Sequence, residues 1–263
     1  MKRVLVVLLV LAMAFGLVAC AKSDASGAAT TLKVAIDDTY PPMEYVDDNG
    51  DLVGFDIEMA KAMAAEMGVE IEFISTGWDG IFGGLAADQY DCIISSVSMT
   101  TERLESMDFS TPYLSNGQVI MVAPGDASIA SMEDLAGKNV GVQFATTADE
   151  AATKALETVQ FEKVAFDDMT VCLAAMKAGQ VDCVVADMAV AIAAVQEDPE
   201  SYTISSLALT NEPIAIAVNK GNTELLNKLN AALKVVQDNG TLSSISEKYL
   251  GADYTKNIDT ELR

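Results

Sequence analysis

A run of hydroxyl side chains that ends in an arginine is the stretch of this sequence best suited to binding an anion. In DCIISSVSMTTER, residues 91–103, five serines and threonines follow an apolar stretch and lead to Arg103, although the chain has only two other arginines. A guanidinium group binds a carboxylate through two parallel hydrogen bonds. We therefore interpret Arg103 as a carboxylate-binding residue, with Ser96 and Ser98 as further polar contacts.

Local helix preferences do not explain Arg103. We expect a helix capped by Thr100 or Thr101, which places Arg103 in its first turn. A cation there opposes the helix macrodipole, at a cost of about 0.3–1 kcal/mol. The alternative to a ligand carboxylate is a surface ion pair with Glu102 or Asp108.

Two loops that follow expected strands carry aromatic and acidic side chains suited to binding. DDTYPPMEY, residues 37–45, supplies Asp37 and Tyr40, and STGWDG, residues 75–80, supplies Trp78, the one tryptophan of the chain. Exposed aromatic side chains on such loops often form binding surfaces. Packing between two lobes explains these aromatic residues equally well.

Two further candidates lie in the second half of the chain. In FATTADE, residues 144–150, Thr147 and Glu150 have the spacing of a capping box, and the free amides of such a helix start also bind anions. Asp187 ends an apolar run, where its carboxylate suits an ammonium group or caps the following helix. Both alternatives stay open for each residue.

The sequence offers no residue set for catalysis, a metal or a cofactor. It has no histidine, which removes Ser-His and Cys-His pairs and imidazole ligands. Its carboxylates lack metal-ligand spacing, and phosphate-binding glycine motifs are missing. Cys92, Cys172 and Cys183 form neither a disulfide framework nor a zinc site, so we expect three small buried hydrophobic side chains.

The composition indicates a folded, acidic protein. The 263 residues are 51% hydrophobic, which is enough for one core or two. The formal net charge is −23, from 16 Lys and Arg against 39 Asp and Glu. Such a surface repels phosphate backbones and anionic lipid, which excludes nucleic-acid binding and membrane docking through basic residues.

The first twenty residues are typical of an export signal. A positively charged start and sixteen uncharged residues make up residues 1–19, too short for a membrane span of about 20 apolar residues. LVAC resembles the lipobox cut by the lipoprotein signal peptidase, which would leave Cys20 as the lipid-bearing first residue. An uncleaved anchor is the alternative. Residues 20–31 fit a flexible tether.

Strand and helix patterns alternate along the rest of the chain. LKVAI and VEIEFI read as strands, and the helical pattern between them has Asp56 as its expected cap and Gly68 as its stop. The alternation starts again after Pro112 and continues to a helical tail. This order predicts an α/β fold with mostly parallel sheets and helices on both faces.

A short internal repeat relates two parts of the chain. DQYDCIISS, residues 88–96, aligns without a gap with GQVDCVVAD, residues 179–187, and each follows an expected helix. We interpret the match as two related α/β lobes, with coincidence as the alternative. Ligands of open parallel sheets bind beyond the carboxyl ends of the strands. The ends at Ser96 and Asp187 would then face each other across a cleft.

The motifs together resemble the family 3 extracellular solute-binding proteins, the amino-acid receptors of ABC importers. The resemblance covers residues 32–251 and rests on LKVAIDDTYPPMEY, WDG, YDCIISSVSMTTERLESMDFSTPY, GKNVGVQFATTADE and GQVDCVVAD. There are two departures from the family pattern. Ala145 stands where many relatives have glycine, and IFGG after Trp78 replaces a proline-containing turn.

The resemblance implies a type II periplasmic-binding fold, in which two hinge strands join two α/β lobes. Lobe 1 would comprise residues 32–114 and 214–263, and lobe 2 residues 115–213. The resemblance also implies ligand-binding roles for eight residues. They are Arg103, Ser98 and Thr147 at the ligand α-carboxylate, Asp187 and Ser96 at the α-ammonium group, Tyr40 and Trp78 as aromatic walls, and Asp37 at the far end of the side chain.

Charge narrows the expected ligand. A dicarboxylic amino acid needs a second cationic partner, and Arg103 is the one candidate arginine. Asp37 and Asp187, with Glu44 and Asp79 nearby, make the cleft negative. We therefore expect a neutral polar or cationic L-amino acid.

The same resemblance implies partners and a location. The ligand would bridge the lobes, and the closed form would dock on an ABC permease. We expect an exported monomer that is either anchored at the outer face of the cell membrane by a lipid on Cys20 or periplasmic. One rival is a dehydratase-like enzyme on the same fold, which the single arginine and acidic cleft disfavour. The other is a sensory module, which would need a separate partner protein.

Overall fold

The computed structural model describes residues 30–206 and 208–262. The expected signal peptide and Cys20 lie outside these residues. In the described chain, no helix combines the length and the apolar character needed to cross a bilayer. Thr31–Arg263 form one compact unit, and its elements alternate between strand and helix as the sequence predicts.

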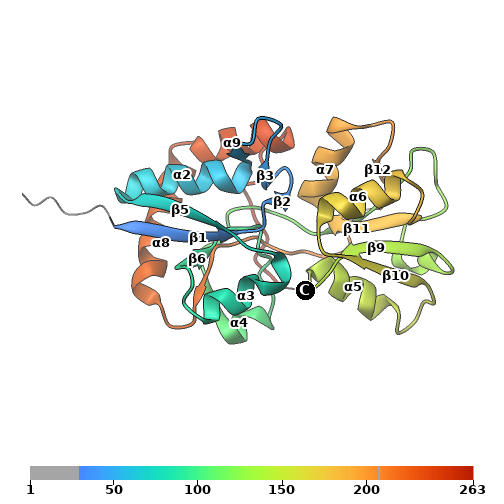
Figure 1. The fold of residues 1–263 in the computed structure, drawn as a ribbon, viewed down its shortest axis with the longest axis horizontal. Helices are drawn as coiled ribbons and strands as arrows, with labels where there is room; N and C mark the ends of the chain where they lie inside the picture. The colour runs from blue at the N-terminus through green and yellow to red at the C-terminus, as the bar shows by residue number, and fades with distance from the viewer. Residues whose placement is uncertain (1–29, 207, 263) are drawn as a thin grey trace, which may run out of the picture. The chain divides into compact units, whose positions relative to one another are not determined.

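The first sheet, the centre of lobe 1, has five strands among the described residues, in the order β5-β1-β6-β13-β7 (Figure 1). β1 pairs in parallel with β5 and β6, whereas β13 pairs antiparallel with β6 and β7. The strands are β1 (Thr31–Ile36), β5 (Glu70–Ser75), β6 (Cys92–Ile93), β7 (Met107–Phe109) and β13 (Ala217–Asn219).

Helices cover both faces of this sheet because alternate residues of its strands are apolar on each side. Val34 and Ile36 of β1 lie in one core with α2, α8 and α9, whereas Ala35 lies in another with α3. The helices are α2 (Phe55–Met67), α3 (Trp78–Ala86), α4 (Arg103–Ser106), α8 (Thr223–Asp238) and α9 (Thr241–Leu250). A small sheet adds β2 (Thr39–Tyr40), β3 (Glu44–Val46) and β4 (Leu52–Val53).

The second sheet, the centre of lobe 2, repeats this design. Its order is β10-β9-β11-β8-β12, with β10, β9 and β11 parallel and β8 antiparallel to both β11 and β12. Helix α5 packs on one face and helices α6 and α7 on the other (Figure 1). The elements are β8 (Gln118–Val122), a 3-10 turn η1 (Met132–Leu135), β9 (Asn139–Gln143), α5 (Thr147–Ala155), β10 (Glu162–Phe166), α6 (Met169–Lys177), β11 (Cys183–Asp187), α7 (Met188–Glu197) and β12 (Thr203–Ile204).

The chain passes between the two sheets twice, from β7 to β8 and from β12 to β13. An antiparallel bridge between Leu114 and Ile214 pairs the two connections. These are the two hinge strands of a type II periplasmic-binding fold. Apart from Thr31, the first residue of β1, which the sequence assigned to the tether, the strands of each sheet fall within the expected lobe ranges. The boundaries themselves stay predictions.

The start of α2 differs from the prediction. Gly54, not Asp56, is the N-cap, whereas Gly68 ends the helix in the left-handed conformation as expected. Only glycine fits at position 54, because a Cβ there would lie 2.2 Å from the backbone oxygen of Met43 and the φ angle is 133°. Asp56 is fully buried in the first turn, and its carboxylate accepts a hydrogen bond from the backbone amide of Ser96 at 2.6 Å.

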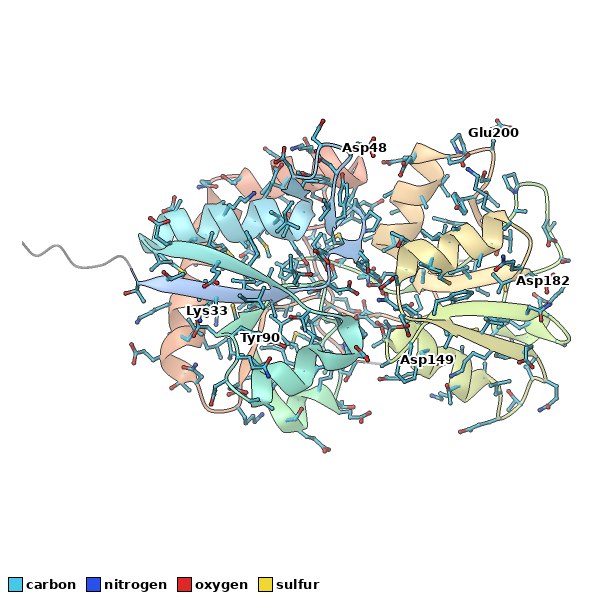
Figure 2. All side chains as sticks on the ribbon, viewed as in Figure 1. Lys33, Asp48, Tyr90, Asp149, Asp182 and Glu200 are labelled. Atoms are coloured by element: carbon cyan, nitrogen blue, oxygen red, sulfur yellow. The ribbon has the colours of Figure 1, made fainter. Side chains whose placement is uncertain are left out.

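The internal repeat corresponds to equivalent strands. β6 and β11 are each third in their sheet, with a parallel neighbour on one side and an antiparallel one on the other. Asp91 and Asp182, before these strands, accept hydrogen bonds from the backbone amides of Lys33 and Asn139 at 2.8 and 2.7 Å. Lys33, within β1, and Asp182, directly before β11, are labelled in Figure 2. The two repeated sequence segments therefore also occupy equivalent positions in the two sheets.

The three cysteines within the described chain agree with the prediction. Cys92, Cys172 and Cys183 are free and buried. Burial raises the pKa of Cys172 and Cys183 to about 12. They act as small apolar side chains in the cores of the two sheets.

Candidate functional site

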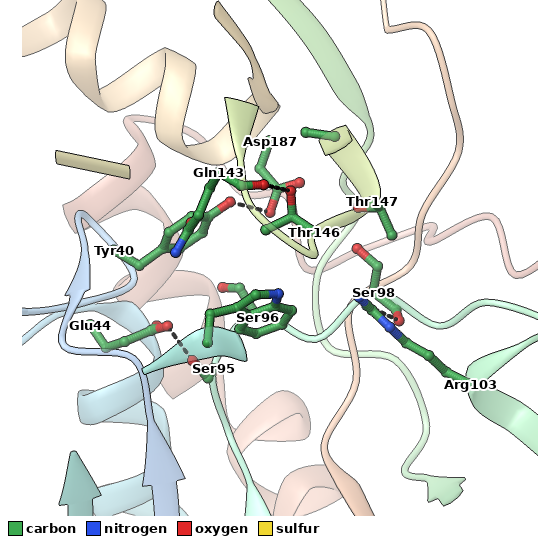
Figure 3. Close-up of a pocket in the computed structure, with 12 residues that line it drawn as sticks. Tyr40, Glu44, Ser95, Ser96, Ser98, Arg103, Gln143, Thr146, Thr147 and Asp187 are labelled. Atoms are coloured by element: carbon green, nitrogen blue, oxygen red, sulfur yellow. Dashed lines mark hydrogen bonds between the residues drawn. The ribbon is translucent and has the colours of Figure 1, made fainter. Parts of the chain in front are cut away.

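A cavity lies where the carboxyl ends of strands from both sheets meet (Figure 3). Seven of the eight ligand-binding residues predicted from the sequence line it. Asp37 does not, but it lies directly behind, where its carboxylate accepts a hydrogen bond from Gln143 Nε2 at 2.8 Å. The lining residues are Tyr40, Glu44, Trp78, Ser95, Ser96, Ser98, Arg103, Gln143, Thr146, Thr147, Ala148 and Asp187.

The cavity is small in this conformation. Its volume is about 20 Å³, which is room for roughly one water molecule. An amino acid therefore fits only after the side chains that fill the space move apart. The fold offers that freedom at its two connections between the sheets.

Arg103 is a buried cation at the edge of the cavity. It is 9% exposed, and among the described residues it has no ion pair within 4.0 Å. Its guanidinium carbon lies 5.5 Å from the ring centre of Trp78 and 4.9 Å from that of Phe82, and Nη1 donates to the backbone oxygen of Ser98 at 3.0 Å. Burial lowers the pKa of Arg103, whereas the carboxylates of Glu150 and Glu212 act against that shift.

The N-cap of the helix that holds Arg103 is Glu102, not Thr100 or Thr101 as predicted, and its side chain makes no capping hydrogen bond. Arg103 is the first residue of α4, and its backbone amide donates to Thr100 Oγ1 at 3.1 Å. The surface ion pair considered as the alternative does not form, since Asp108 pairs with Lys220 at 3.0 Å. The guanidinium instead faces inward, with N–H groups left for an acceptor in the cavity.

The serines before Arg103 bind carboxylates of the protein itself. Ser98 Oγ donates to Glu212 Oε2 at 2.9 Å. Ser96 has a φ angle of 46°, and its hydroxyl lies 3.2 Å from Asp56 Oδ2, the oxygen that also accepts from its amide. Ser95, to which the sequence assigns no role, donates to Glu44 Oε1 at 2.6 Å.

Lobe 2 contributes the start of α5, one residue away from the prediction. The N-cap is Thr146, not Thr147, and its hydroxyl oxygen accepts from the amide of Asp149 at 3.3 Å while donating to the backbone of Gln143 at 2.7 Å. Thr147, freed from capping, accepts from Gln118 Nε2 at 3.0 Å. The expected box between Thr147 and Glu150 does not form.

Asp187 ends β11 and occupies the N-cap position of α7 without capping it. Its carboxylate accepts from Tyr40 Oη at 2.8 Å (Figure 3). It also accepts from Gln118 Nε2 at 2.6 Å. Burial raises the pKa of Asp187 to about 6, and the neighbouring carboxylate of Glu212 adds to the rise. The side chain is therefore directed into the cavity region rather than along the helix.

The aromatic residues connect the lobes as well as line the cavity. Tyr40 reaches from lobe 1 to Asp187, and Trp78 Nε1 donates to the backbone oxygen of Ala145 at 2.9 Å. Ala145 itself has a φ angle of 59°, the left-handed region that favours glycine. Tyr40 and Trp78 therefore line the cavity and also make contacts between the lobes, as the two alternative sequence interpretations suggested.

Sequence reasoning missed two polar residues beside the cavity. Gln118 Nε2 lies within 3.1 Å of acceptors on Thr147, Asp187 and Glu212. Gln118, the first residue of β8, is fully buried, and Glu212, in the connection from β12 to β13, is nearly so. No local pattern marks them. Gln143, by contrast, ends a strand and follows the same strand-end rule as Asp187.

A scan against protein-family models matches residues 32–252 to the bacterial extracellular solute-binding proteins, family 3. The chain belongs to this family. Among curated relatives, it is 34% identical over 227 residues to the L-cystine-binding protein TcyJ of Escherichia coli (strain K12), covering 86% of this chain and 85% of that one.

Solved structures of similar proteins share the fold of this solute-binding protein. An ancestral arginine-binding protein bound to arginine is 42% identical with a TM-score of 0.80, and the complex of such a protein with glutamine has a TM-score of 0.78 at the same identity; each match covers 84% of this chain and 98% of the other. The ancestral amino acid-binding protein AncCDT-1, a precursor of cyclohexadienyl dehydratase, is 35% identical with a TM-score of 0.78, covering 84% of this chain and 95% of that one.

The charges around the cavity of this solute-binding protein are opposite in the two lobes. Lobe 1 presents the Arg103 guanidinium and lobe 2 the Asp187 carboxylate, and both line one space. Within the described chain, no cluster of His, Cys, Asp and Glu could hold a metal ion. The arrangement suits a zwitterion, whose carboxylate and ammonium group each find an opposite charge.

Proposed function

We propose that the protein is an extracytoplasmic receptor that binds a cationic or neutral polar L-amino acid between its lobes and delivers it to an ABC permease. The observation that carries this proposal is the pairing of Arg103 and Asp187. The guanidinium of Arg103 is buried and has no ion pair among the described residues, so it is free to bind the α-carboxylate, with Ser98 and Thr147 beside it. Asp187, with Ser96 opposite, accepts the α-ammonium group.

The side-chain end of the cavity supports a ligand without a second negative charge. Arg103 is the one cation that lines the cavity, and the α-carboxylate occupies it. Glu44 lines the other end and Asp37 lies behind Gln143, with Tyr40 and Trp78 as aromatic walls. Burying a second carboxylate beside these groups would be costly. The neighbours bound to arginine and to glutamine fit this charge rule. The cystine-binding relative does not, because cystine carries two carboxylates.

Closure of the lobes would couple binding to transport. Tyr40 and Trp78 already reach across to Asp187 and Ala145, and these contacts break when the lobes separate. A ligand held by Arg103 on one lobe and Asp187 on the other favours the closed form. The permease would recognise that form.

An enzyme on the same fold is the second candidate, because AncCDT-1 is a precursor of a dehydratase. A bulky dicarboxylate would again need a second cation beside Arg103. The carboxylates of Glu44 and Asp187 oppose it, so we infer a binding protein and not an enzyme. A sensory module that passes ligand binding to a receptor uses the same cleft and differs only in the partner.

Export and anchoring are part of the proposal. Residues 1–19 act as a lipoprotein signal peptide, and Cys20 carries the lipid that keeps the receptor, a monomer, at the outer face of the membrane near its permease. Residues 32–114 with 214–263 form lobe 1, and residues 115–213 form lobe 2. Mass spectrometry of the membrane fraction tests the anchor, since a lipid-modified N-terminal Cys20 is expected.

Calorimetric titration of the purified, ligand-stripped protein with single amino acids tests the proposed function. We expect L-arginine, L-lysine, L-histidine or L-glutamine to bind and L-glutamate to bind at least about 100-fold more weakly than the best of them. Glutamate as the tightest ligand would overturn the charge argument. No binding of any amino acid would overturn the receptor.

A further inference from the structure

Glu44 is a fully buried residue in the cavity wall. The proposed contacts to the α-carboxylate and α-ammonium groups of the ligand do not involve it. It begins β3, and its Oε1 accepts the hydrogen bond of Ser95 at 2.6 Å (Figure 3). Among the described residues, its Oε2 receives no hydrogen bond. A fully buried carboxyl oxygen without a donor is costly unless it carries a proton or meets a cation.

Asp56 lies beside Glu44 and also has one carboxyl oxygen without a hydrogen-bond donor among the described residues. It is fully buried on α2, and its Oδ2 accepts from the amide and hydroxyl of Ser96. Its Oδ1, within the described chain, has no donor either. The two side chains lie close enough for a hydrogen bond between them once one is protonated. A single proton would therefore satisfy both oxygens, since the acid donates and the carboxylate accepts.

No basic residue compensates this pair. The ion pairs of the described chain join lysines to carboxylates elsewhere, and none includes Glu44 or Asp56. The titratable groups that face the pair are Asp37 and Tyr40 near Glu44 and Tyr113 near Asp56. Burial, and then the Asp56 carboxylate, raise the pKa of Glu44 well above its usual value, and burial raises the pKa of Asp56 to about 6.

We propose that Glu44 determines specificity at the side-chain end of the ligand, and that the Glu44–Asp56 pair releases its shared proton to solvent when a cationic side chain enters. The inference rests on the proposed function, because it needs an amino acid in this cavity. A neutral polar side chain leaves the proton in place and donates a hydrogen bond to an oxygen of the protonated acid. One site then accepts both ligand classes, and pH sets the preference between them.

Binding-linked proton release distinguishes this role from a purely structural one. Calorimetry of the native protein with L-arginine and with L-glutamine, each in phosphate and in Tris at pH 7.5, gives the number of protons released from the buffer dependence of the heat. We expect arginine to release about one proton more than glutamine. Glutamine corrects for Asp187, which meets the α-ammonium group of every ligand alike.

The outcomes separate the inference from the proposed function. Equal proton release with arginine and glutamine overturns the inference and leaves the receptor standing. Binding of neither ligand, nor of any other amino acid, overturns the receptor itself. A preference for arginine over glutamine that stays constant from pH 6 to pH 8.5 also contradicts the inference, since a released proton must make the arginine affinity rise with pH.

Substitution sharpens the test. Glu44→Gln keeps the shape but cannot ionise, so we expect arginine affinity to fall at least about tenfold, glutamine affinity to change by less than about threefold, and the extra proton to disappear. Persistence of the extra proton in this variant overturns the assignment to Glu44. Glu58→Gln on α2, which alters contacts with Lys248 and Tyr249 away from the cavity, is the matched control and should change neither affinity nor proton count. If Glu44→Gln does not fold, the buffer comparison on the native protein still decides.

Discussion

β6 and β11 occupy the same position in the two sheets, yet they differ at the ends that reach the cavity. Directly before each strand, an aspartate accepts a hydrogen bond from a backbone amide of the neighbouring strand, Asp91 in one lobe and Asp182 in the other. β6 runs on into the serines and Arg103, whereas β11 stops at Asp187. The starts hold the fold together in the same way, and the ends supply opposite charges. Two copies of one strand design thus become the two poles of a zwitterion site.

The largest effect should come from removing the positive pole. Arg103→Ala leaves a bound α-carboxylate buried without its partner, so we expect at least about a 100-fold loss of affinity for every amino acid that binds. Calorimetric titration measures the loss. Lys220→Ala, which removes an ion pair with Asp108 away from the cavity, is the control and should bind normally. Binding retained by Arg103→Ala would mean that the guanidinium serves only packing against Trp78 and Phe82.

Removing the negative pole should cost less, because the side-chain amide oxygen that Asp187→Asn introduces still accepts the hydrogen bond of Tyr40. We expect the affinity to fall by about 10- to 100-fold, the loss of one charge-assisted contact to the α-ammonium group. Asp182→Asn, at the other end of the same strand, gives the comparison and should leave affinity unchanged. Equal losses from both substitutions would remove the distinction between strand starts and strand ends.

Acid should act on the two poles unequally, because only Asp187 titrates near neutrality. Burial raises its pKa from 3.8 to about 6, so lowering the pH from 7.5 to 5 protonates it and should weaken binding by about tenfold. The effect on folding has the opposite sign. The folded protein holds this proton at a higher pH than the unfolded chain, so the contribution of Asp187 to the free energy of unfolding is full below about pH 4 and is lost as the pH rises through 6.

Titrations with ligand and thermal unfolding without ligand, both from pH 4 to 8, measure the two effects. The Asp187→Asn variant should lose the part of each pH dependence that belongs to this side chain. A native protein and a variant with superimposable affinity profiles would show that another group, such as Asp56, controls binding in this range.

The sequence carries more information about strand starts and ends than about the space between lobes. Alternating strands and helices, Gly68 and the repeat of residues 88–96 at 179–187 are local patterns, and the fold followed from them. Seven of the eight predicted site residues line the cavity because they follow strands whose carboxyl ends meet there.

The errors concern features that tertiary contacts decide. Asp56 has the residue type and place of a helix cap, but the backbone of Met43 demands glycine at position 54 and Asp56 turns to Ser96 instead. Gln118 begins β8 and Glu212 lies in the connection from β12 to β13, and no local sequence pattern marks either residue. Their importance depends on lobes that meet only in the folded chain.

A smaller effect should follow from weakening a contact between the lobes without touching either pole. Trp78→Phe keeps an aromatic ring near Arg103 but removes the hydrogen bond to Ala145. We expect affinity to fall by roughly 2- to 10-fold, the worth of one neutral hydrogen bond made on closure. In the native protein, the fluorescence of this single tryptophan should change on binding, and an unchanged spectrum with a ligand that raises the melting temperature would place Trp78 outside the closing interface.

The smallest effect on binding is expected at the strand starts, and it tests the equivalence of the lobes most directly. Asp91→Ala and Asp182→Ala each remove exposed hydrogen bonds to a neighbouring strand, which should lower the free energy of unfolding by about 1 kcal/mol. The melting temperature should then fall by about 2–4 °C in each variant, as for a protein of this size. Because neither aspartate is near the cavity, affinity should change by less than about twofold in both. A loss of binding in one variant alone would show that the aspartate of that lobe contributes to binding as well as to folding. β6 and β11 would then differ at their starts as well as at their carboxyl ends.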